Sequence, residues 1–545
     1  MRPTTSARMV RERMVDAALA GVLMAAPGPV AGALPIAPDW QVTGEGPGNS
    51  AFGGSVAGAG DVNGDGFADL LVGAERFGHD ASHAGEGRVY LYLGSAAGPA
   101  HSAAWTTDGG QQDARLGRSV SGAGDVNGDG YDDVVVGAAL FDSLFTNEGQ
   151  VRVFHGSATG LAASPAWTEE GGSANALLGG SVAAAGDVNG DGYGDVLVGV
   201  QNLVNRGEAR VYLGSPSGLA ADPVWRYRGE PLEYFGSAVA GAGDVNGDGF
   251  DDILVGGPST NNPFRVGRAY LFLGSPSGPI GYYSWVLAAS TPFTALGSVL
   301  AGIGDLNGDG LDDIAVGAPG ERNTVAGDAF VFLGAPFGYL VAAPWPASPP
   351  GGRGQGFASS LAGMDWDQDG YPDIIVGDPF VSNSQPLAGR VLVHRGSPSG
   401  PLSSPDWIAE GDVARGLLGQ SVAAAGDVNG DGTTDLLVGA PSLPLEAEGS
   451  VALYLSGIDL DGDGFPVPAD CDDTDPAVHP GAVDLPGDAV DSDCDGGPAC
   501  APSADWRNAG AFVHCVVTAC DDLVRAGLVA RHDCDDLIAQ AARAD

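Results

Sequence analysis

The chain has 545 residues and contains no lysine, so its 24 basic residues are all arginines, set against 69 acidic residues. Without lysine, Schiff-base chemistry and the phosphate-binding P-loop are excluded. The formal net charge of −45 excludes the basic face that nucleic-acid binding requires, and it opposes unaided binding to anionic membranes. The sequence therefore indicates an acidic protein that needs cations.

Cysteine is absent from residues 34–455, and all six cysteines lie between Cys471 and Cys534. An even number of cysteines in an exported chain indicates about three disulfides, so the first part of the chain must be held together by other means. Beyond the first 33 residues, no stretch reaches the ~18 apolar residues that a membrane span needs. Although 90 residues are glycine, 44% are hydrophobic, which argues against disorder.

Residues 1–33 have the pattern of a secretory signal peptide. Several arginines precede an apolar stretch over residues 17–26, and Ala31, Gly32 and Ala33 form a small-residue cleavage site. The alternative is an amphipathic N-terminal helix. We expect cleavage after Ala33 and a mature protein that is secreted or located at the cell surface, with no transmembrane segment.

A self-similar unit recurs seven times at intervals of 57 to 64 residues. Each unit contains a small-residue run, an Asp-rich nonapeptide, an apolar run that contains a glycine near its end, and, after a variable loop, an aromatic and β-branched segment. The tryptophans that precede the units are Trp40, Trp105, Trp167, Trp225, Trp285, Trp345 and Trp407. Four short strands per unit, with turn residues between them, predict the blade of a β-propeller.

We therefore predict an all-β fold, a seven-bladed β-propeller, over residues 34–457. The Ala/Gly-rich run is narrow enough for the innermost strand, the Val/Leu/Ile run is expected to be buried on both faces, and the aromatic segments suit the wider outer strands. Because the last unit has only three strands, we expect the strand at Trp40 to complete the seventh blade and close the ring, which removes exposed edges. An open solenoid is the alternative.

The nonapeptide places side-chain oxygens around one point in every copy. Position 1 is Asp61, Asp125, Asp187, Asp244, Asp305, Asp365 and Asp427. Position 3 is Asn63, Asn127, Asn189, Asn246, Asn307, Asp367 and Asn429. Position 5 is Asp65, Asp129, Asp191, Asp248, Asp309, Asp369 and Asp431. Position 9 is Asp69, Asp133, Asp195, Asp252, Asp313, Asp373 and Asp435.

Such a set of hard oxygen donors, without His or Cys, selects Ca²⁺ over transition metals. The backbone carbonyl of position 7 is expected to add a ligand. Position 7 is Phe67, Tyr131, Tyr193, Phe250, Leu311, Tyr371 and Thr433. A metal-free Asn-Gly or Asp-Gly hairpin turn is the alternative, but such a turn does not need Asp at positions 1, 5 and 9 in seven copies. We expect Asp132, Asp251 and Asp312, at position 8, to be solvated neighbours rather than ligands.

The repeats resemble FG-GAP repeats. Phe52-Gly53 and Phe235-Gly236 match the first half of that name, and Gly317-Ala-Pro319 and Gly439-Ala-Pro441 match the second half. The resemblance implies the seven-bladed propeller of integrin α subunits and of many secreted bacterial proteins. It also implies calcium loops between the first and second strands on one face, and ligand binding on the opposite face.

Two copies depart from the common pattern. In the sixth loop Gln368 replaces a glycine, so we expect its turn geometry to differ, and in the seventh loop Thr433 stands where most copies carry an aromatic residue. An integrin receptor function is not implied.

The composition changes abruptly after the last repeat, with twelve aspartates within residues 459–495. Positions 1, 3, 5 and 12 of a calcium loop would be Asp459, Asp461, Asp463 and Asp470. Residues 458–498 resemble the MopE-type metal-binding motif, which implies a Cys471–Cys494 disulfide, and an acidic solvated linker is the alternative. Residues 499–545 are expected to form a small, disulfide-linked helical segment. Zinc is the alternative there, and its candidate ligands are His514, Cys515, Cys520, His532 and Cys534.

No nucleophile elbow, zinc-protease helix or phosphate loop appears in the sequence, so we expect no enzyme. The favoured function is cell adhesion or ligand binding by a monomer through variable loops, with an extracellular glycan or protein as ligand. The candidate loops are residues 75–86, 138–148, 257–266, 318–326 and 378–388. A calcium-stabilised extracellular scaffold without a specific ligand is the alternative, and a propeller hydrolase with an axial pocket is a further one.

Overall fold

The computed structural model describes residues 38–456, apart from short segments at 46–49, 81, 260–265, 291–293, 321–326, 344, 346–355, 384 and 443–447. The expected signal peptide, the Asp-rich segment with its Cys471–Cys494 disulfide, and the C-terminal helical segment lie outside the described residues. Within the described residues, no helix is long and apolar enough to cross a membrane.

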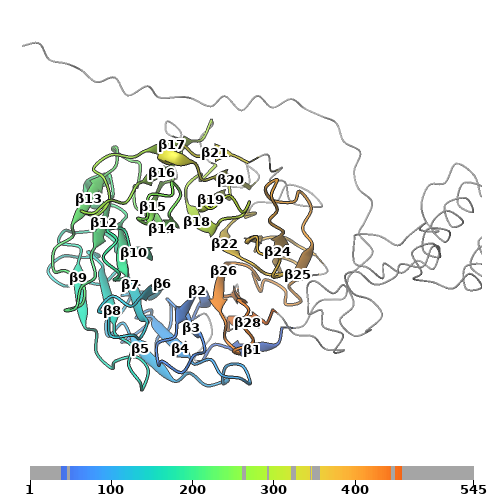
Figure 1. Cartoon of the computed structure of the whole chain (residues 1–545). Helices are drawn as coiled ribbons and strands as arrows, with labels where there is room; N and C mark the ends of the chain where they lie inside the picture. The colour runs from blue at the N-terminus through green and yellow to red at the C-terminus, as the bar shows by residue number, and fades with distance from the viewer. Residues whose placement is uncertain are drawn as a thin grey trace, which may run out of the picture. The chain divides into compact units, whose positions relative to one another are not determined.

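Seven four-stranded antiparallel sheets surround a central axis (Figure 1), and we number them as blades 1 to 7. The innermost strands are β2 (Phe52–Gly60), β6 (Leu116–Gly124), β10 (Leu178–Gly186), β14 (Ala238–Gly243), β18 (Val299–Gly304), β22 (Ser360–Met364) and β26 (Ser421–Gly426). The second strands are β3 (Asp69–Ala74), β7 (Asp133–Ala138), β11 (Asp195–Val200), β15 (Asp252–Gly257), β19 (Asp313–Ala318), β23 (Asp373–Gly377) and β27 (Asp435–Ala440).

The third strands are β4 (Arg88–Tyr92), β8 (Gln150–Phe154), β12 (Glu208–Tyr212), β16 (Arg268–Phe272), β20 (Asp328–Leu333), β24 (Arg390–His394) and β28 (Ser450–Tyr454). The outermost strands are β5 (Trp105–Asp108), β9 (Trp167–Glu170), β13 (Trp225–Arg228), β17 (Trp285–Ala288), β21 (Val341–Ala342), β25 (Trp407–Glu410) and β1 (Trp40–Thr43). Two short 3₁₀ helices, η1 (Leu203–Asn205) and η2 (Pro336–Gly338), lie in loops. The all-β, seven-bladed prediction is confirmed.

The composition of each strand matches its distance from the axis. The inner strands approach one another so closely that a Cβ on Gly58 would lie 2.8 Å from the Ala424 carbonyl oxygen, and one on Gly122 would lie 2.9 Å from that of Gly58. Only small residues fit there. In β3 all six residues are buried, because neighbouring blades cover both of its faces. Leu71 and Leu91 of blade 1 accordingly share one apolar cluster with Val134 and Phe154 of blade 2.

Each repeat tryptophan joins its blade to the next one. The Trp225 ring of blade 3 packs edge-on against Phe272 of blade 4 at 4.8 Å between centroids, and its Nε1–H donates to the Ile280 carbonyl at 3.0 Å. Edge-to-face packing places the positive edge of one ring against the negative face of another. The same contact recurs around the ring in Trp105–Phe154, Trp167–Tyr212, Trp285–Phe332, Trp345–His394, Trp407–Tyr454 and Trp40–Tyr92.

The two ends of the propeller meet in blade 7, as the sequence predicts. Strand β1 pairs antiparallel with β28, with Trp40 opposite Leu453 and Val42 opposite Val451. Blade 7 therefore takes three strands from the C-terminal end and its outermost strand from the N-terminal end. The Trp40 ring then packs against Tyr92 of blade 1 at 5.2 Å, so this one strand both completes a sheet and joins the first blade to the last.

We predict that Trp40→Ala lowers the free energy of unfolding of the propeller by about 3–5 kcal/mol, the usual cost of truncating a buried tryptophan. Trp40 is only 5% exposed. Gln41→Ala, at an exposed position of the same strand, is the control and should change the free energy by less than about 0.5 kcal/mol. Urea unfolding of the two variants measures this difference, and equal stabilities would contradict a closing role for β1.

Candidate functional site

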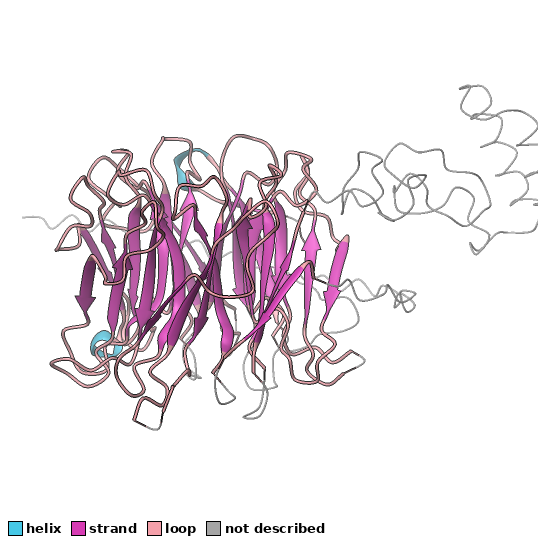
Figure 2. Cartoon of the chain, turned by 90° about the horizontal axis from the view of Figure 1, so that it is seen from below, coloured by secondary structure: helices cyan, strands magenta, loops and turns pink. Residues whose placement is uncertain are grey.

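The seven Asp-rich loops lie on one face of the ring. Each follows an innermost strand and precedes a second strand, and since the strands are antiparallel and run between the two faces (Figure 2), all seven loops emerge on the same side. We call this side the Asp-loop face. The loops between second and third strands, and the connections between blades, emerge on the opposite face.

The aspartate at position 1 holds the turn of its loop together. In the first loop, Asp61 Oδ1 accepts hydrogen bonds from the amides of Gly64 (2.7 Å) and Asp65 (3.1 Å), and Oδ2 accepts one from Gly66 (2.8 Å). The Asn63 side chain joins the same cluster, because its Oδ1 accepts from the Asp65 amide at 3.0 Å. The same three bonds to position 1 recur at Asp125, Asp187, Asp244 and Asp427.

The aspartate at position 9 is the most unusual group of the loop, because it is a carboxylate with no exposure to solvent. Asp69 is 0% exposed, and its two oxygens accept from the amides of Val62 (3.0 Å) and Gly94 (2.9 Å). Burial, together with the nearby Asp65 and Asp61, raises the pKa of the Asp69 carboxyl to about 7. Position 9 therefore ties the loop to the end of the third strand, and its ionised form requires a compensating charge.

The other copies repeat this arrangement. Burial raises the pKa to about 7 for the Asp133, Asp195 and Asp313 carboxyls, and to about 8 for that of Asp252. All seven position-9 side chains are fully buried, including those of Asp373 and Asp435.

The donor set fits a hard divalent cation. Each loop offers carboxylate or amide oxygens at positions 1, 3 and 5, backbone carbonyls, and a buried carboxylate at position 9, and oxygen donors of this kind suit calcium. A cation bound there would also neutralise the carboxylates that raise one another's pKa. These loops could hold calcium, whereas the predicted ligands Asp459, Asp461, Asp463 and Asp470 lie outside the described residues.

Neighbouring loops pack on one another through positions 4 and 7. A Cβ added to Gly64 would lie 2.7 Å from Cε1 of Tyr131 in the next loop, and one added to Gly190 would lie 2.8 Å from Cε1 of Phe250. The glycine at position 4 therefore leaves room for the position-7 side chain of the following blade. The two departures in the sequence fall at these positions in consecutive copies. Gln368, a long residue, is at position 4 of the sixth loop, and Thr433, a small residue, is at position 7 of the seventh loop.

The change of turn geometry expected at Gln368 is not seen in the backbone torsion of that residue. Gln368 has φ of 59°, in the left-handed region that the glycines at this position also occupy. The Gly370 amide still donates to Asp365 Oδ2 at 3.0 Å. The backbone turn is thus kept, at the cost of placing a side chain in a conformation that favours glycine.

The expectation that the position-8 aspartates are only solvated neighbours also needs correction. Asp132 Oδ2 accepts a hydrogen bond from the amide of Asp61, in the preceding blade, at 2.8 Å, and the Asp132 amide donates back to the Asp61 carbonyl at 3.2 Å. Asp251 and Asp312 bind the preceding loops in the same way. These carboxylates therefore form hydrogen bonds between adjacent blades. Partial burial raises the pKa of each of them.

A cavity of about 560 Å³ lies on the opposite face, around the axis, where inner strands of several blades begin. Its charged lining includes Glu75, Arg76 and Arg118. Arg118 Nη1 lies 3.4 Å from one oxygen of Glu75 and Arg76 Nε lies 3.6 Å from the other. Phe380, which is 40% exposed, adds an apolar wall. Two of the predicted variable loops, 75–86 and 378–388, thus contribute to or adjoin this cavity.

Comparison with known proteins agrees with this geometry. The FG-GAP repeat profile matches residues 52–92, 116–154, 297–332 and 418–454, and an FG-GAP-like profile matches residues 187–255. The matched segments of the propeller are therefore FG-GAP and FG-GAP-like repeats. A MopE-type metal-binding motif matches residues 470–498, beyond the FG-GAP propeller.

The FG-GAP propeller is similar to parts of integrin α subunits. It is 42% identical over 183 residues to human integrin alpha-IIb, which covers 32% of this chain and 17% of that protein. It is 32% identical over 229 residues to integrin alpha-5 of Xenopus laevis, which covers 39% of this chain and 21% of that protein. The matched region is therefore about one fifth of the length of these curated relatives.

We predict that metal removal destabilises the propeller more strongly as the pH rises. The pKa of Asp69 in the folded state is about 7, above the ordinary value of 3.8 for an aspartate carboxyl. In the metal-free protein the folded state therefore holds more protons between these values, so stability is greatest at low pH and falls as the pH rises through about 7. Calcium requires the ionised form and should reverse this loss. Thermal unfolding in chelator and in calcium, from about pH 5 to about pH 8, measures the effect, and identical midpoints at the higher pH would contradict it.

We predict that positions 4 and 7 of consecutive loops are energetically coupled. Gly190→Gln should lower the free energy of unfolding by about 1–3 kcal/mol, through its positive φ and its clash with Phe250. Adding Phe250→Thr should recover part of this loss, with a coupling of about 0.5–3 kcal/mol. The control is Gly192→Gln. Gly192 also has a positive φ, but a Cβ added there would have no neighbouring atom within 4 Å. Two results would contradict the packing of Phe250 on Gly190. One is the absence of coupling between Gly190→Gln and Phe250→Thr, and the other is an equal coupling between Gly192→Gln and Phe250→Thr.

Proposed function

We propose that this chain is an extracellular, calcium-stabilised β-propeller that binds a ligand, as in adhesion, through the face opposite the Asp loops. The observation that carries the proposal is the axial cavity of about 560 Å³ with Glu75, Arg76 and Arg118 in its lining. The similarity to integrin α subunits supports a binding protein rather than an enzyme.

Calcium has a structural role in this proposal. Extracellular modules bind calcium with dissociation constants of roughly 10⁻⁴–10⁻³ M, so at millimolar calcium each loop would add about 0.4–1.4 kcal/mol of stability. Seven loops together would add about 3–10 kcal/mol, which is comparable with the stability of a whole domain. Since the Asp loops and the cavity lie on opposite faces, calcium does not contact the ligand. It supports ligand binding by stabilising the folded propeller.

The cavity lining indicates the chemistry of the ligand. In a chain with 69 acidic residues and a net charge of −45, two arginines at the axis provide a local group of cationic hydrogen-bond donors. Both guanidinium side chains are 45% exposed, and the single carboxylate of Glu75 lies between them. Arginine recognises carboxylates through paired N–H donors. We therefore propose a ligand that carries carboxylates, such as an acidic glycan or an acidic protein segment.

Binding to immobilised polygalacturonate tests this proposal, with neutral dextran as the comparison, in calcium and in chelator. The Arg76→Ala/Arg118→Ala variant should lose at least about tenfold in affinity, since charge-assisted hydrogen bonds contribute about 1.5–3 kcal/mol each, and it should keep its thermal midpoint. Arg226→Ala, at an exposed position on β13, is the matched control and should bind as the unsubstituted chain does.

Two outcomes would contradict the proposal. If the folded, calcium-loaded chain binds neither polygalacturonate nor immobilised acidic proteins, a scaffold without a specific ligand is favoured. If it binds but the double variant binds equally well, the ligand does not use the axial cavity.

A further inference from the structure

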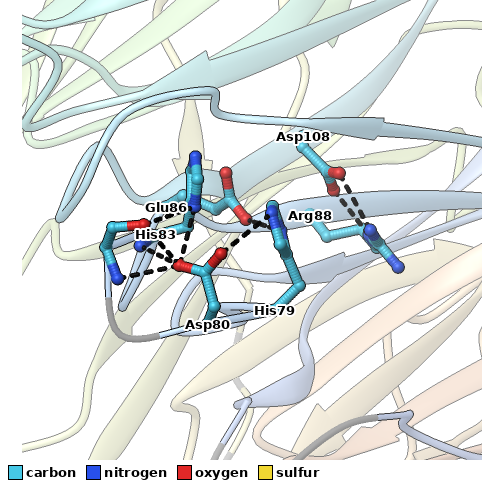
Figure 3. Close-up of polar contacts among 7 residues, drawn as sticks. His79, Asp80, His83, Glu86, Arg88 and Asp108 are labelled. Atoms are coloured by element: carbon cyan, nitrogen blue, oxygen red, sulfur yellow. Dashed lines mark hydrogen bonds and ion pairs between the residues drawn. The ribbon is translucent and has the colours of Figure 1, made fainter.

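A cluster of histidines and carboxylates lies in the loop between β3 and β4 of blade 1 (Figure 3). His79 and His83 stack with 4.3 Å between ring centroids, and Asp80 lies beside both. Asp80 Oδ1 is 2.8 Å from His83 Nδ1, and Asp80 Oδ2 is 3.8 Å from His79 Nε2. One potential ligand atom from each of these three residues lies within 4.8 Å of the others.

A buried carboxylate contacts His79 of this cluster. Glu86 is only 1% exposed, and its Oε1 lies 2.6 Å from His79 Nδ1. Neither Glu86 oxygen accepts a hydrogen bond within the part of the chain that the structure describes, so the contact with His79 is an ion pair. The contact with His79 is therefore the interaction that compensates this buried charge.

Blade 2 provides an internal comparison. Glu148 stands at the matching place, before the glycine that precedes the third strand, and it is also 1% exposed. Its oxygens accept hydrogen bonds from the backbone amides of Ser143 (3.0 Å), Phe145 (2.9 Å) and Gly172 (3.1 Å). Glu148 is thus satisfied by its own loops, whereas Glu86 is directed to a histidine.

The other acidic group nearby is already paired. Asp108 accepts hydrogen bonds from Arg88 Nε at 2.5 Å and Arg88 Nη2 at 2.8 Å, and the Arg88 guanidinium lies 3.9 Å from the Phe77 ring centroid. A carboxylate held by a bidentate arginine is a poor metal ligand, because its lone pairs and charge are already engaged. Asp108 therefore does not belong to the ligand set.

The hydrogen bonds of the loop determine which atoms face a common point. The Glu86 carboxylate lies at Nδ1 of His79, so Nε2 is the ring nitrogen of His79 that faces Asp80. Asp80 Oδ1 accepts from the amides of Ser82 (2.8 Å) and His83 (3.0 Å), which fixes the carboxylate and leaves Oδ2 facing His79. Buried carboxylates that orient metal-bound histidines in this way are a common feature of metal sites.

We propose that His79, Asp80 and His83 bind a borderline divalent cation such as Zn²⁺, with Glu86 as the buried carboxylate that orients His79. Two imidazoles and one carboxylate suit zinc and disfavour calcium, so this site differs in chemistry from the Asp loops. Three protein ligands leave a fourth coordination position for water or for a ligand of the propeller. The site lies on the face opposite the Asp loops and does not depend on the proposed function.

Zinc titration calorimetry of the full chain in saturating calcium tests the proposal, because calcium fills the hard oxygen sites first. The His79→Asn/His83→Asn variant should bind one equivalent of zinc fewer than the unsubstituted chain. His101→Asn removes an exposed histidine elsewhere on blade 1 and should leave the stoichiometry unchanged. Zinc bound outside the described residues is common to all three proteins, so the difference isolates this site.

Glu86→Gln tests whether Glu86 orients His79 without binding the metal itself. It should keep the stoichiometry and weaken this zinc site about 10–100-fold, the usual effect of losing a partner of a metal-bound histidine. Thermal midpoints without zinc verify that each variant is folded, and His83→Asn alone replaces the double variant if that one is unstable. An unchanged number of zinc equivalents at unchanged affinity in the histidine variants would overturn the site, and unchanged affinity in Glu86→Gln would overturn the role of Glu86.

Discussion

Each blade depends on its neighbours to bury both faces of its apolar second strand. Strands such as β3 are buried along their whole length, and a four-stranded sheet on its own would expose two apolar faces to water. The seven tryptophan contacts, the shared apolar clusters and the close approach of the inner strands all cross from one blade to the next. Closure of the ring by β1 is therefore a condition for the stability of every blade.

Repulsion among the carboxylates of the Asp-loop face disfavours this tight packing of the blades. Position 9 places a fully buried carboxylate in each blade, and the carboxylates of Asp61 and Asp65 lie near enough to raise the pKa of Asp69. The same loops carry the contacts between blades at positions 4, 7 and 8. A cation in each loop would thus neutralise repulsion at the place where consecutive blades meet.

Much of the fold could be predicted from the sequence, because the repeat shows which features are shared. The Ala/Gly-rich, apolar and aromatic runs identify three strands of each blade, and the surplus strand at Trp40 predicts ring closure. Contacts between copies are harder to predict. The hydrogen bonds of Asp132 with Asp61 and the relation between positions 4 and 7 join residues about one repeat apart, and a single copy of the motif gives no sign of either.

The histidine cluster is a second feature that could not be predicted from the sequence. His79, Asp80 and His83 lie within a loop that the sequence marks as variable, and their spacing alone does not separate a metal site from a polar turn. The deciding residue is Glu86, whose burial and orientation come from the fold. Glu148 has the same place in the repeat but different partners, so residue identity could not have distinguished them.

Anomalous scattering from crystals grown in calcium is the most direct test of calcium occupancy in the Asp loops. We predict one anomalous peak in each Asp loop, coordinated by side-chain oxygens of positions 1, 3, 5 and 9 and by the carbonyl of position 7. Ordered loops without such peaks, in crystals saturated with calcium, would contradict it and would leave the buried carboxylates protonated.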